Sequence, residues 1–546
     1  MYVQATTSRR GRKTYVTHQI RESFRTPDGP RSRTLCNISM LPPEVIAMIR
    51  EALRGREMVP AEALELESAR DFGGLAVLAD AWGRFGLDAL LPRDCTARRR
   101  ALVKAMVFSR LLFPCSKLGL AARAEGTLLA AACGLPADEA FGEDDLYGAL
   151  DALTGHWTAM EKGMAADALE GPPSLVLYDL TSVYFEGDGP AGWSRYGHSR
   201  DHRGDRPQVV LAVAADARGV PLHISVLRGN RADTRTLRGL LALLRRRFGL
   251  AEAVFVFDGG MSSRVNLERL EAEGLKFVTR LSQATLDALL REQEGTVQLR
   301  LDDRDRLMEI THGGRRHVLA GGPWRARRDR ERRDLRLARG EAALRKLASA
   351  RRRKPDAQRI ASQAGRALDK VKAHKYFRYR VDGEGTLRWE TDRAAVEEEA
   401  ARDGWFLLRT NLEPETADAG RVLGHYKNLL EVEDAFRELK SYLEVRPVFH
   451  RRPDRVINHV RVCFLAYWIS ARLGVEWAAR GERGEVPRIL RRLQGVRLGR
   501  FRVAGTDVGD RLAITRIPPD LNATLSRLDL LGLFRSPPRW AVRGEA

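Results

Sequence analysis

The chain has 546 residues, long enough for roughly three or four domains. Its hydrophobic fraction of 44% can fill ordinary cores, which excludes an intrinsically disordered protein. Lys and Arg number 93 against 72 Asp and Glu, and the formal charge of +21 predicts a polyanionic partner such as nucleic acid. An arginine-rich composition set by a GC-rich genome is the alternative explanation for this charge.

Five cysteines are scattered along the chain, without a CxxC pair. They predict reduced thiols in a cytosolic protein, and they exclude a disulfide framework or a zinc finger. The first residues lack the apolar core of a secretory signal. No run approaches the length of about 18 apolar residues that a membrane span needs, so we expect no membrane association.

The first 170 residues divide into two predicted parts. Residues 1–60 form a small β-rich module, in which strands at 14–26 and 33–41 flank a Pro-Asp-Gly-Pro turn and a helix follows at 44–53. Residues 61–170 are rich in Ala and Leu with helical periodicity. We expect this second part to be a helical, DNA-binding domain, although it contains no helix-turn-helix signature.

A sheet pattern begins near residue 171. Strands are expected within 174–187, 208–227 and 253–258. A helix at 234–249 precedes the strand at 253–258, and a further helix and a strand follow that strand, up to residue 281. This order predicts an α/β fold with a mixed sheet and helices on its faces.

The segment 282–403 interrupts this pattern and is too long for a loop. It contains strand-like pieces and a very basic helical run at 325–354, so we expect a β-rich and basic helical insertion domain. The run is either a solvated, salt-bridged helix or a strip that grips the DNA backbone. Trp324 and Trp405 are expected in the core. The sheet resumes in 404–475, and 476–546 form a C-terminal region.

Two aspartates follow apolar strands, and a glutamate follows on a helix. Asp179 ends SLVLYD and Asp258 ends AVFVFD, while Glu433 lies in YKNLLEVEDAFRELK at 426–440. At 3.6 residues per turn Tyr426, Glu433, Arg437 and Lys440 share one face of a continuous helix. The plain alternatives are a turn-forming role for each Asp and a solvated ion-pair face for the helix.

If these three carboxylates converge, they form a site for hard cations such as Mg²⁺, since neither Cys nor clustered His accompanies them. Two such ions about 4 Å apart activate a nucleophile and stabilise the leaving oxygen of an in-line displacement. Phosphodiester hydrolysis or strand transfer is the chemistry that this site predicts.

Three sequence blocks resemble the DDE transposases of the IS4-type superfamily, and within it most closely the IS1634 group. The blocks are YDLTSVYFEG at 178–187 with its continuation at 196–237, FDGGMSSRVNLERL at 257–270, and YKNLLEVEDAFRELKSYLEVRPVFH at 426–450 with its continuation to 469. The resemblance implies an RNase H-like fold interrupted by an insertion domain. It also implies cleavage at insertion-sequence ends and attack of the 3′-hydroxyl on target DNA.

The family's catalytic triad maps onto Asp179, Asp258 and Glu433, which would bind two Mg²⁺ ions, with Mn²⁺ as a substitute. Its Tyr–Arg–Glu–Lys signature maps onto Tyr426, Leu429, Glu433 and Lys440, so leucine occupies the arginine position. The resemblance implies that Tyr426 and Lys440 hold phosphates. Arg437, one turn beyond Glu433, is the candidate to replace the missing arginine.

The resemblance further implies a bacterial, cytoplasmic and nucleoid-associated protein that forms a homodimer when it joins two DNA ends. Two other functions fit the same residues. One is a catalytically inactive, DNA-binding repressor or host factor derived from a transposase, and the other is an RNase H-like nuclease without strand transfer.

Overall fold

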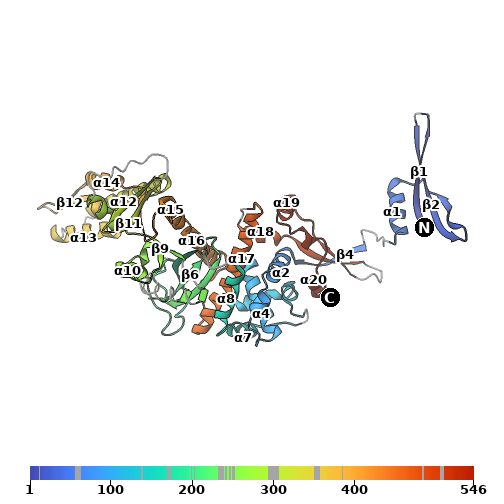
Figure 1. The fold of residues 1–546 in the computed structure, drawn as a ribbon, viewed down its shortest axis with the longest axis horizontal. Helices are drawn as coiled ribbons and strands as arrows, with labels where there is room; N and C mark the ends of the chain where they lie inside the picture. The colour runs from blue at the N-terminus through green and yellow to red at the C-terminus, as the bar shows by residue number, and fades with distance from the viewer. Residues whose placement is uncertain are drawn as a thin grey trace.

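The computed structural model describes most of the chain, as shown in Figure 1. The described residues are 1–11, 13–55, 63–136, 139–168, 174–197, 199–201, 203–230, 239, 243–244, 247–248, 253–292, 306–349, 357–383, 385–482, 485–503 and 510–545. The expected helix at 234–249 and the strand-like piece at 296–303 lie mostly or wholly outside them.

The N-terminal module is a three-stranded antiparallel sheet with one helix, and it stands apart from the body of the molecule (Figure 1). Its elements are β1 (Tyr2–Arg10), β2 (Lys13–Thr26), β3 (Gly29–Asn37) and α1 (Pro43–Leu53). The strand expected at 14–26 and the helix expected at 44–53 form as β2 and α1, whereas the strand expected at 33–41 begins earlier and covers Gly29–Asn37 as β3. β1 was not expected, because its Thr, Ser and Arg side chains give no apolar alternation.

A helical region follows β4 (Leu64–Asp71), as expected from the Ala- and Leu-rich pattern. Its helices are α2 (Gly73–Arg84), α3 (Leu87–Leu90), α4 (Ala97–Leu112), α5 (Lys117–Ala124), α6 (Leu129–Cys133), α7 (Glu143–Asp151) and α8 (Trp157–Ala168). No single helix in the described residues has the length and apolar composition of a membrane span. Only α4 and α5 taken together reach them, and these two helices meet at 95°.

An eight-stranded mixed sheet forms the centre of the body, in the order β10-β11-β14-β9-β8-β5-β6-β7. Its strands are β5 (Leu175–Tyr184), β6 (Gln208–Ala215), β7 (Pro221–Arg228), β8 (Val254–Phe257), β9 (Lys276–Arg280), β10 (Arg306–His312), β11 (Arg315–Gly321) and β14 (Trp405–Thr410). β8 is parallel to both β5 and β9, and the other pairs are antiparallel. An antiparallel meander that continues into parallel strands is the sheet expected of an RNase H-like fold.

Both faces of this sheet are covered, which explains why β5 and β6 are almost continuously apolar. Every residue of β6 is buried. One face packs on a cluster that includes Leu267 and Leu270 of α10 (Arg264–Ala272). The other face packs on the main core, which contains α17 (Pro453–Ala479).

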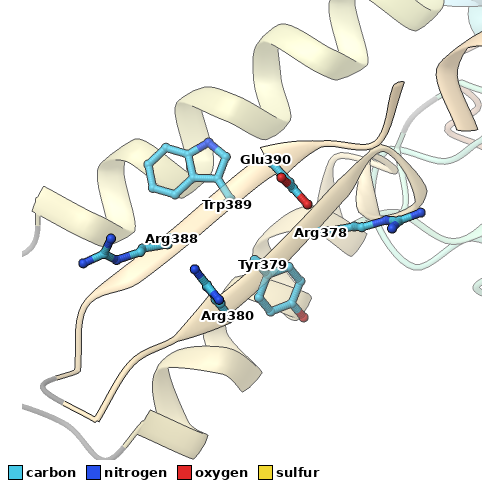
Figure 2. A pocket seen from close by; sticks show the side chains of 6 residues that line it. All are labelled: Arg378, Tyr379, Arg380, Arg388, Trp389 and Glu390. Atoms are coloured by element: carbon cyan, nitrogen blue, oxygen red, sulfur yellow. The ribbon is translucent and has the colours of Figure 1, made fainter. Parts of the chain in front are cut away.

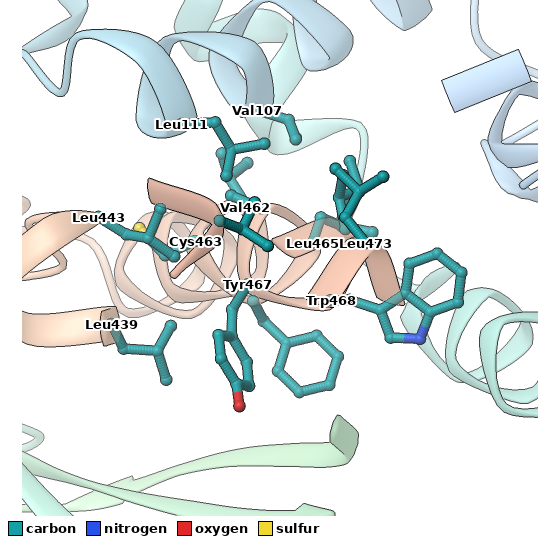
Figure 3. Close-up of a cluster of buried hydrophobic side chains, with 14 of the residues drawn as sticks. Val107, Leu111, Leu439, Leu443, Val462, Cys463, Leu465, Tyr467, Trp468 and Leu473 are labelled. Carbon is teal, nitrogen blue, oxygen red and sulfur yellow. The ribbon is translucent and has the colours of Figure 1, made fainter. Parts of the chain in front are cut away.

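Helix α17 joins the sheet to the helical region, because it contacts both β7 and α4. Figure 3 shows the apolar side chains at this junction, with Val107 and Leu111 of α4 above Val462 and Leu465 of α17. The fully buried Trp468 extends the cluster. The helical region is therefore fixed to the central sheet by a shared core.

The segment 282–403 serves two structural purposes. Its hairpin β10–β11 joins the central sheet through β14. The remaining elements enclose a small core of their own around Leu344, Leu368 and Tyr376. They are α12 (Pro323–Ser349), α13 (Ala357–Lys370), β12 (Phe377–Val381), β13 (Leu387–Thr391) and α14 (Arg393–Ala400). Helix α11 (Gln283–Glu292) packs instead on the central sheet, where its Leu286 and Leu289 lie in one cluster with Leu407 of β14.

The hairpin β12–β13 carries a basic pocket, shown in Figure 2 with Arg378, Arg380 and Arg388 around it. Arg380 and Arg388 lie directly opposite each other in the register. Arg378 and Arg388 are paired with the carboxylates of Asp392 at 2.8 Å and Asp382 at 3.5 Å, so part of this positive charge is neutralised within the segment.

The C-terminal region closes onto the helical region. Its elements are α18 (Val486–Leu493), β15 (Arg497–Val503), β16 (Arg511–Ile514), α19 (Pro519–Arg527) and α20 (Arg539–Glu545). β15 pairs with both β16 and β4, so the strand that precedes the helical region completes a sheet with the C-terminal region.

Candidate active site

Asp179 and Asp258 are neighbours because two parallel strands pair in register. Tyr178 of β5 lies opposite Phe257 of β8, and an aspartate follows directly after each of these two residues. Asp258 directly follows β8, as expected. The expectation that Asp179 ends its strand is wrong, because β5 continues to Tyr184 through its pairing with β6.

Glu433 reaches the same place from a helix that packs against β5. The expectation of one continuous helix over 426–440 is wrong. The chain forms α15 (Ala419–Lys427), a break at Asn428, α16 (Leu429–Arg437) and the π-helical segment η4 (Glu438–Tyr442). The break and the wider π turn change the angular spacing, so Tyr426 and Glu433 still line one cavity whereas Arg437 and Lys440 do not.

The three carboxylates line one cavity of about 260 Å³, together with Thr181 and Arg200. The pKa of Asp179 is raised to about 7, chiefly by burial and also by the charges of Asp258 and Glu433. The Leu180 N–H, which donates to Asp179 Oδ1 at 2.7 Å, opposes the shift. Burial and the charge of Asp258 also raise the pKa of Glu433. The site therefore concentrates more negative charge than its surroundings neutralise.

The donor set fits a hard divalent cation, because it offers carboxylate oxygens alone. In the described part of the chain no group of three His, Cys, Asp or Glu side chains stands in metal-ligand geometry. Binding an ion between Asp179, Asp258 and Glu433 therefore requires their carboxylates to move closer together. A bound cation would favour that movement, because its charge would offset the repulsion among the carboxylates that contributes to the raised pKa of Asp179.

Tyr426 lies beside the carboxylates. Its hydroxyl donates to Asp258 Oδ1 at 3.5 Å, and its ring lies 5.8 Å from that of Phe406. The pKa of Tyr426 is raised, chiefly by burial and then by the charge of Asp258. The hydroxyl therefore keeps its proton and can donate a hydrogen bond.

A larger cavity of about 660 Å³ opens next to the carboxylates, lined by Asp258, Glu433 and Tyr426 and by several cations. Arg280 comes from the end of β9, and Arg325 and Arg328 come from the first turns of α12. Burial lowers the pKa of Arg325, and the nearby Arg280 lowers it further. Clustered arginines of this kind are suited to bind phosphate.

Leu429, at the arginine position of the family signature, is buried and lines this larger cavity. Arg280, Arg325 and Arg328 supply positive charge to the cavity instead. Arg280 was not predicted as a site residue, and no local pattern separates Arg325 and Arg328 from the rest of the basic run. The positions of Arg325 and Arg328 depend on the fold of 282–403, which no local pattern reveals.

Trp324 and Trp405, near this cavity, differ in their exposure to solvent. Trp405 is 2% exposed, as expected of a core residue. The expectation for Trp324 is wrong, because it is 65% exposed at the rim of the cavity, with the Arg328 guanidinium 4.7 Å from its ring centroid. Its place near the start of α12 directs it to the surface.

The structure does not bring Lys440 and Arg437 to the carboxylates in the same way. Lys440 is mostly buried and its Nζ lies 2.7 Å from Asp201 Oδ1. Arg437 is exposed, pairs with Asp434 at 2.6 Å, and lines a separate groove with Glu431 and other residues. Neither Lys440 nor Arg437 therefore points into the cavity that Glu433 lines, because each is paired with an aspartate elsewhere.

Comparisons with known proteins agree with the sequence blocks. A family model described as the transposase DDE domain matches residues 170–469, more than half of the chain, and a model of the IS1634 family transposase N-terminal domain matches residues 3–62. No curated protein matches significantly. Among solved structures, a piggyBac transposase synaptic complex with hairpin DNA matches 78% of this chain and 80% of its own, with 8% identity and a TM-score of 0.39. The chain belongs to the DDE transposase family, and its N-terminal residues match the N-terminal domain of IS1634 transposases.

Proposed function

We propose that this transposase cuts DNA at the ends of its insertion sequence and joins those ends to target DNA. The observation that carries the proposal is the cavity in which Asp179, Asp258 and Glu433 meet from β5, β8 and α16. The raised pKa of Asp179 supports a site that is incomplete without a cation.

Asp179, Asp258 and Glu433 would hold the divalent ions, two Mg²⁺ in the simplest arrangement. When bound, such ions activate water or a 3′-hydroxyl as the nucleophile and stabilise the leaving oxygen. Hydrolysis and strand transfer then differ only in which hydroxyl attacks the phosphodiester.

The chain's own cations would position the DNA strand. Arg280, Arg325 and Arg328 border the carboxylates and can neutralise the phosphates on either side of the scissile bond. The protonated hydroxyl of Tyr426 can donate to a phosphate oxygen next to Asp258. Lys440 would act indirectly, because its ion pair with Asp201 holds η4 against the loop at 199–201.

The basic helix α12 would continue the DNA path away from the site. It begins at the larger cavity and carries arginines along its 27 residues. Its buried Arg333 is held by Asp403 and is structural, whereas the exposed arginines remain suited to phosphate contacts. Two such chains would act together, since two ends must be joined.

Cleavage and strand transfer should be assayed separately, with end DNA and Mg²⁺, on Glu433→Gln and the matched control Glu431→Gln. Glu431 lies two residues away on the same helix but faces the groove of Arg437. We expect Glu433→Gln to lose both reactions by at least about a thousandfold and Glu431→Gln to keep both.

The same assay decides between the alternatives. A wild-type chain that binds end DNA but cuts nothing would be the inactive repressor. A chain that cuts ends but never joins pre-cut ends to target DNA would be a plain nuclease. Equal activity of the two glutamate variants would refute the assignment of Glu433.

A further inference from the structure

The N-terminal sheet has two chemically different faces, which its register defines. Strand residues alternate between faces, and residues opposite each other in a register pair share one. The first face contains Gln4 opposite Gln19 and Thr6 opposite Thr17. Side-chain contacts agree, because Arg21 donates to Gln4 Oε1 at 2.6 Å and Thr34 donates to Gln19 Oε1 at 3.4 Å.

We call this first surface the polar face. Its described residues include neither Asp nor Glu and no aliphatic side chain. They are hydroxyl, amide and cationic residues plus one proline: Tyr2, Gln4, Thr6, Ser8, Lys13, Tyr15, Thr17, Gln19, Arg21, Ser23, Arg25, Pro30, Ser32, Thr34 and Asn37.

The opposite face is an ordinary amphipathic surface. Val3 and Ile20 are opposite each other there and are partly buried, and α1 packs against β1. The carboxylate of Glu22 lies on this face, where it accepts from Arg33 at 2.9 Å. Because the aliphatic strand residues Val3 and Ile20 lie on this face, the polar face contributes no aliphatic side chain to the fold of the module.

We infer that the polar face lies in the major groove of duplex DNA and reads the sequence at the ends of the insertion sequence. β1 pairs with residues 13–21 of β2 and β3 pairs with residues 19–26, so most of the face is two strands wide, and the 14 residues of β2 extend about 46 Å. A major groove is about 12 Å wide and admits a two-stranded β-ribbon. The face is therefore narrow enough for the groove and long enough to follow it for somewhat more than one turn of about 35 Å.

The side chains match the chemistry of base edges. Gln and Asn pair with adenine, Arg and Lys pair with guanine, and Ser and Thr hydroxyls pair with either, whereas a carboxylate would be repelled by the phosphates. The exposed Tyr2 and Tyr15 add hydroxyls at two edges of the surface. An acidic protein would need only the cations and would leave the many hydroxyls and amides without a role.

The inference deepens the proposed function by assigning end recognition to the module matched at residues 3–62. Its test needs DNA binding alone and no catalysis, so the two can fail separately. If Mg²⁺-dependent cleavage is absent but the polar face determines binding to end DNA, the inference stands and the proposed function falls.

The experiment compares two full-length double variants with the same change in composition. Thr17→Ala with Arg25→Ala alters the polar face, whereas Thr14→Ala with Arg31→Ala alters the opposite face. Binding is measured by fluorescence anisotropy in EDTA, over a range of salt concentrations. The probes are labelled duplexes from both ends of the element that carries the gene, and an unrelated duplex of equal length.

We expect the polar-face variant to bind end duplexes at least about tenfold more weakly and to lose most of its preference over the unrelated duplex. Its salt dependence should stay close to that of the wild type, because the altered side chains contact bases rather than phosphates. The opposite-face variant should match the wild type within about twofold, since single surface contacts contribute little. Equal affinities of the two variants, or an equal loss on end and unrelated duplexes, would overturn the inference. Circular dichroism confirms that both variants are folded.

Discussion

Replacing Asp179 with Asn should stabilise the protein in the absence of divalent ions. The pKa of Asp179 is raised from the ordinary 3.8 to about 7, chiefly by burial. Between these two values the folded state holds a proton that the unfolded chain has released, so the free energy of unfolding falls as pH rises from about 4 to about 7. At about 1.4 kcal/mol per pKa unit, the ionised side chain costs the folded protein up to about 4 kcal/mol above pH 7.

Asparagine removes the charge and keeps an oxygen that can accept from the Leu180 N–H, which donates at 2.7 Å. Chemical denaturation in EDTA at several pH values measures the difference between Asp179→Asn and the wild type. The advantage of the variant should grow by about 2 kcal/mol between pH 5 and pH 7 and level off above about pH 8. Adding Mg²⁺ should stabilise the wild type more than the variant.

A variant that is equally stable or less stable at pH 8 would refute this reasoning. So would a difference that does not change between pH 5 and pH 7. Either result would mean that Asp179 is not held in an unfavourable, ion-dependent environment.

Other variants test the remaining contacts. Arg325→Ala should reduce end cleavage by about tenfold or more, because it removes a cation from the cavity of the carboxylates, whereas Arg437→Ala should leave the rate within about twofold in the same assay. Lys440→Met should cost about 3 kcal/mol in urea denaturation, since Asp201 stays buried without its nearest partner, and unchanged stability would contradict its structural role. Trp324→Ala should leave the melting temperature unchanged because the side chain is exposed, and a large decrease on heating would show that it packs in the core.

Local pattern predicted much of the central sheet. The apolar runs around Asp179 and Asp258 predicted both strands within a mixed sheet, whereas their direct parallel pairing is known only from the structure. The apolar run before Asp179 could not show where β5 ends. The residues after Asp179 continue the strand because they pair with β6, which follows later in the sequence. The hairpin β10–β11 likewise joins the central sheet through a contact with β14 that no local pattern encodes.

The sequence predicted the three carboxylates of the site but not the arginines that line the cavity beside them. Strand order and the family motif both place Asp179, Asp258 and Glu433 together. The helix break at Asn428 and the π turn around Lys440 change which side chains follow Glu433 into the cavity. The arginines that occupy the cavity come from α12 and the end of β9, so only the tertiary fold identifies them.

The most direct measurement replaces Mg²⁺ with Fe²⁺ and maps where the polypeptide is cut by locally generated hydroxyl radicals. If Asp179, Asp258 and Glu433 share a metal centre, cuts should appear near all three residues, and excess Mg²⁺ should suppress them together. The Glu433→Gln variant should weaken the cuts at the two aspartates as well, and Glu431→Gln should leave the pattern unchanged. Cuts that spare the region of Glu433, or that persist with excess Mg²⁺, would contradict a shared centre.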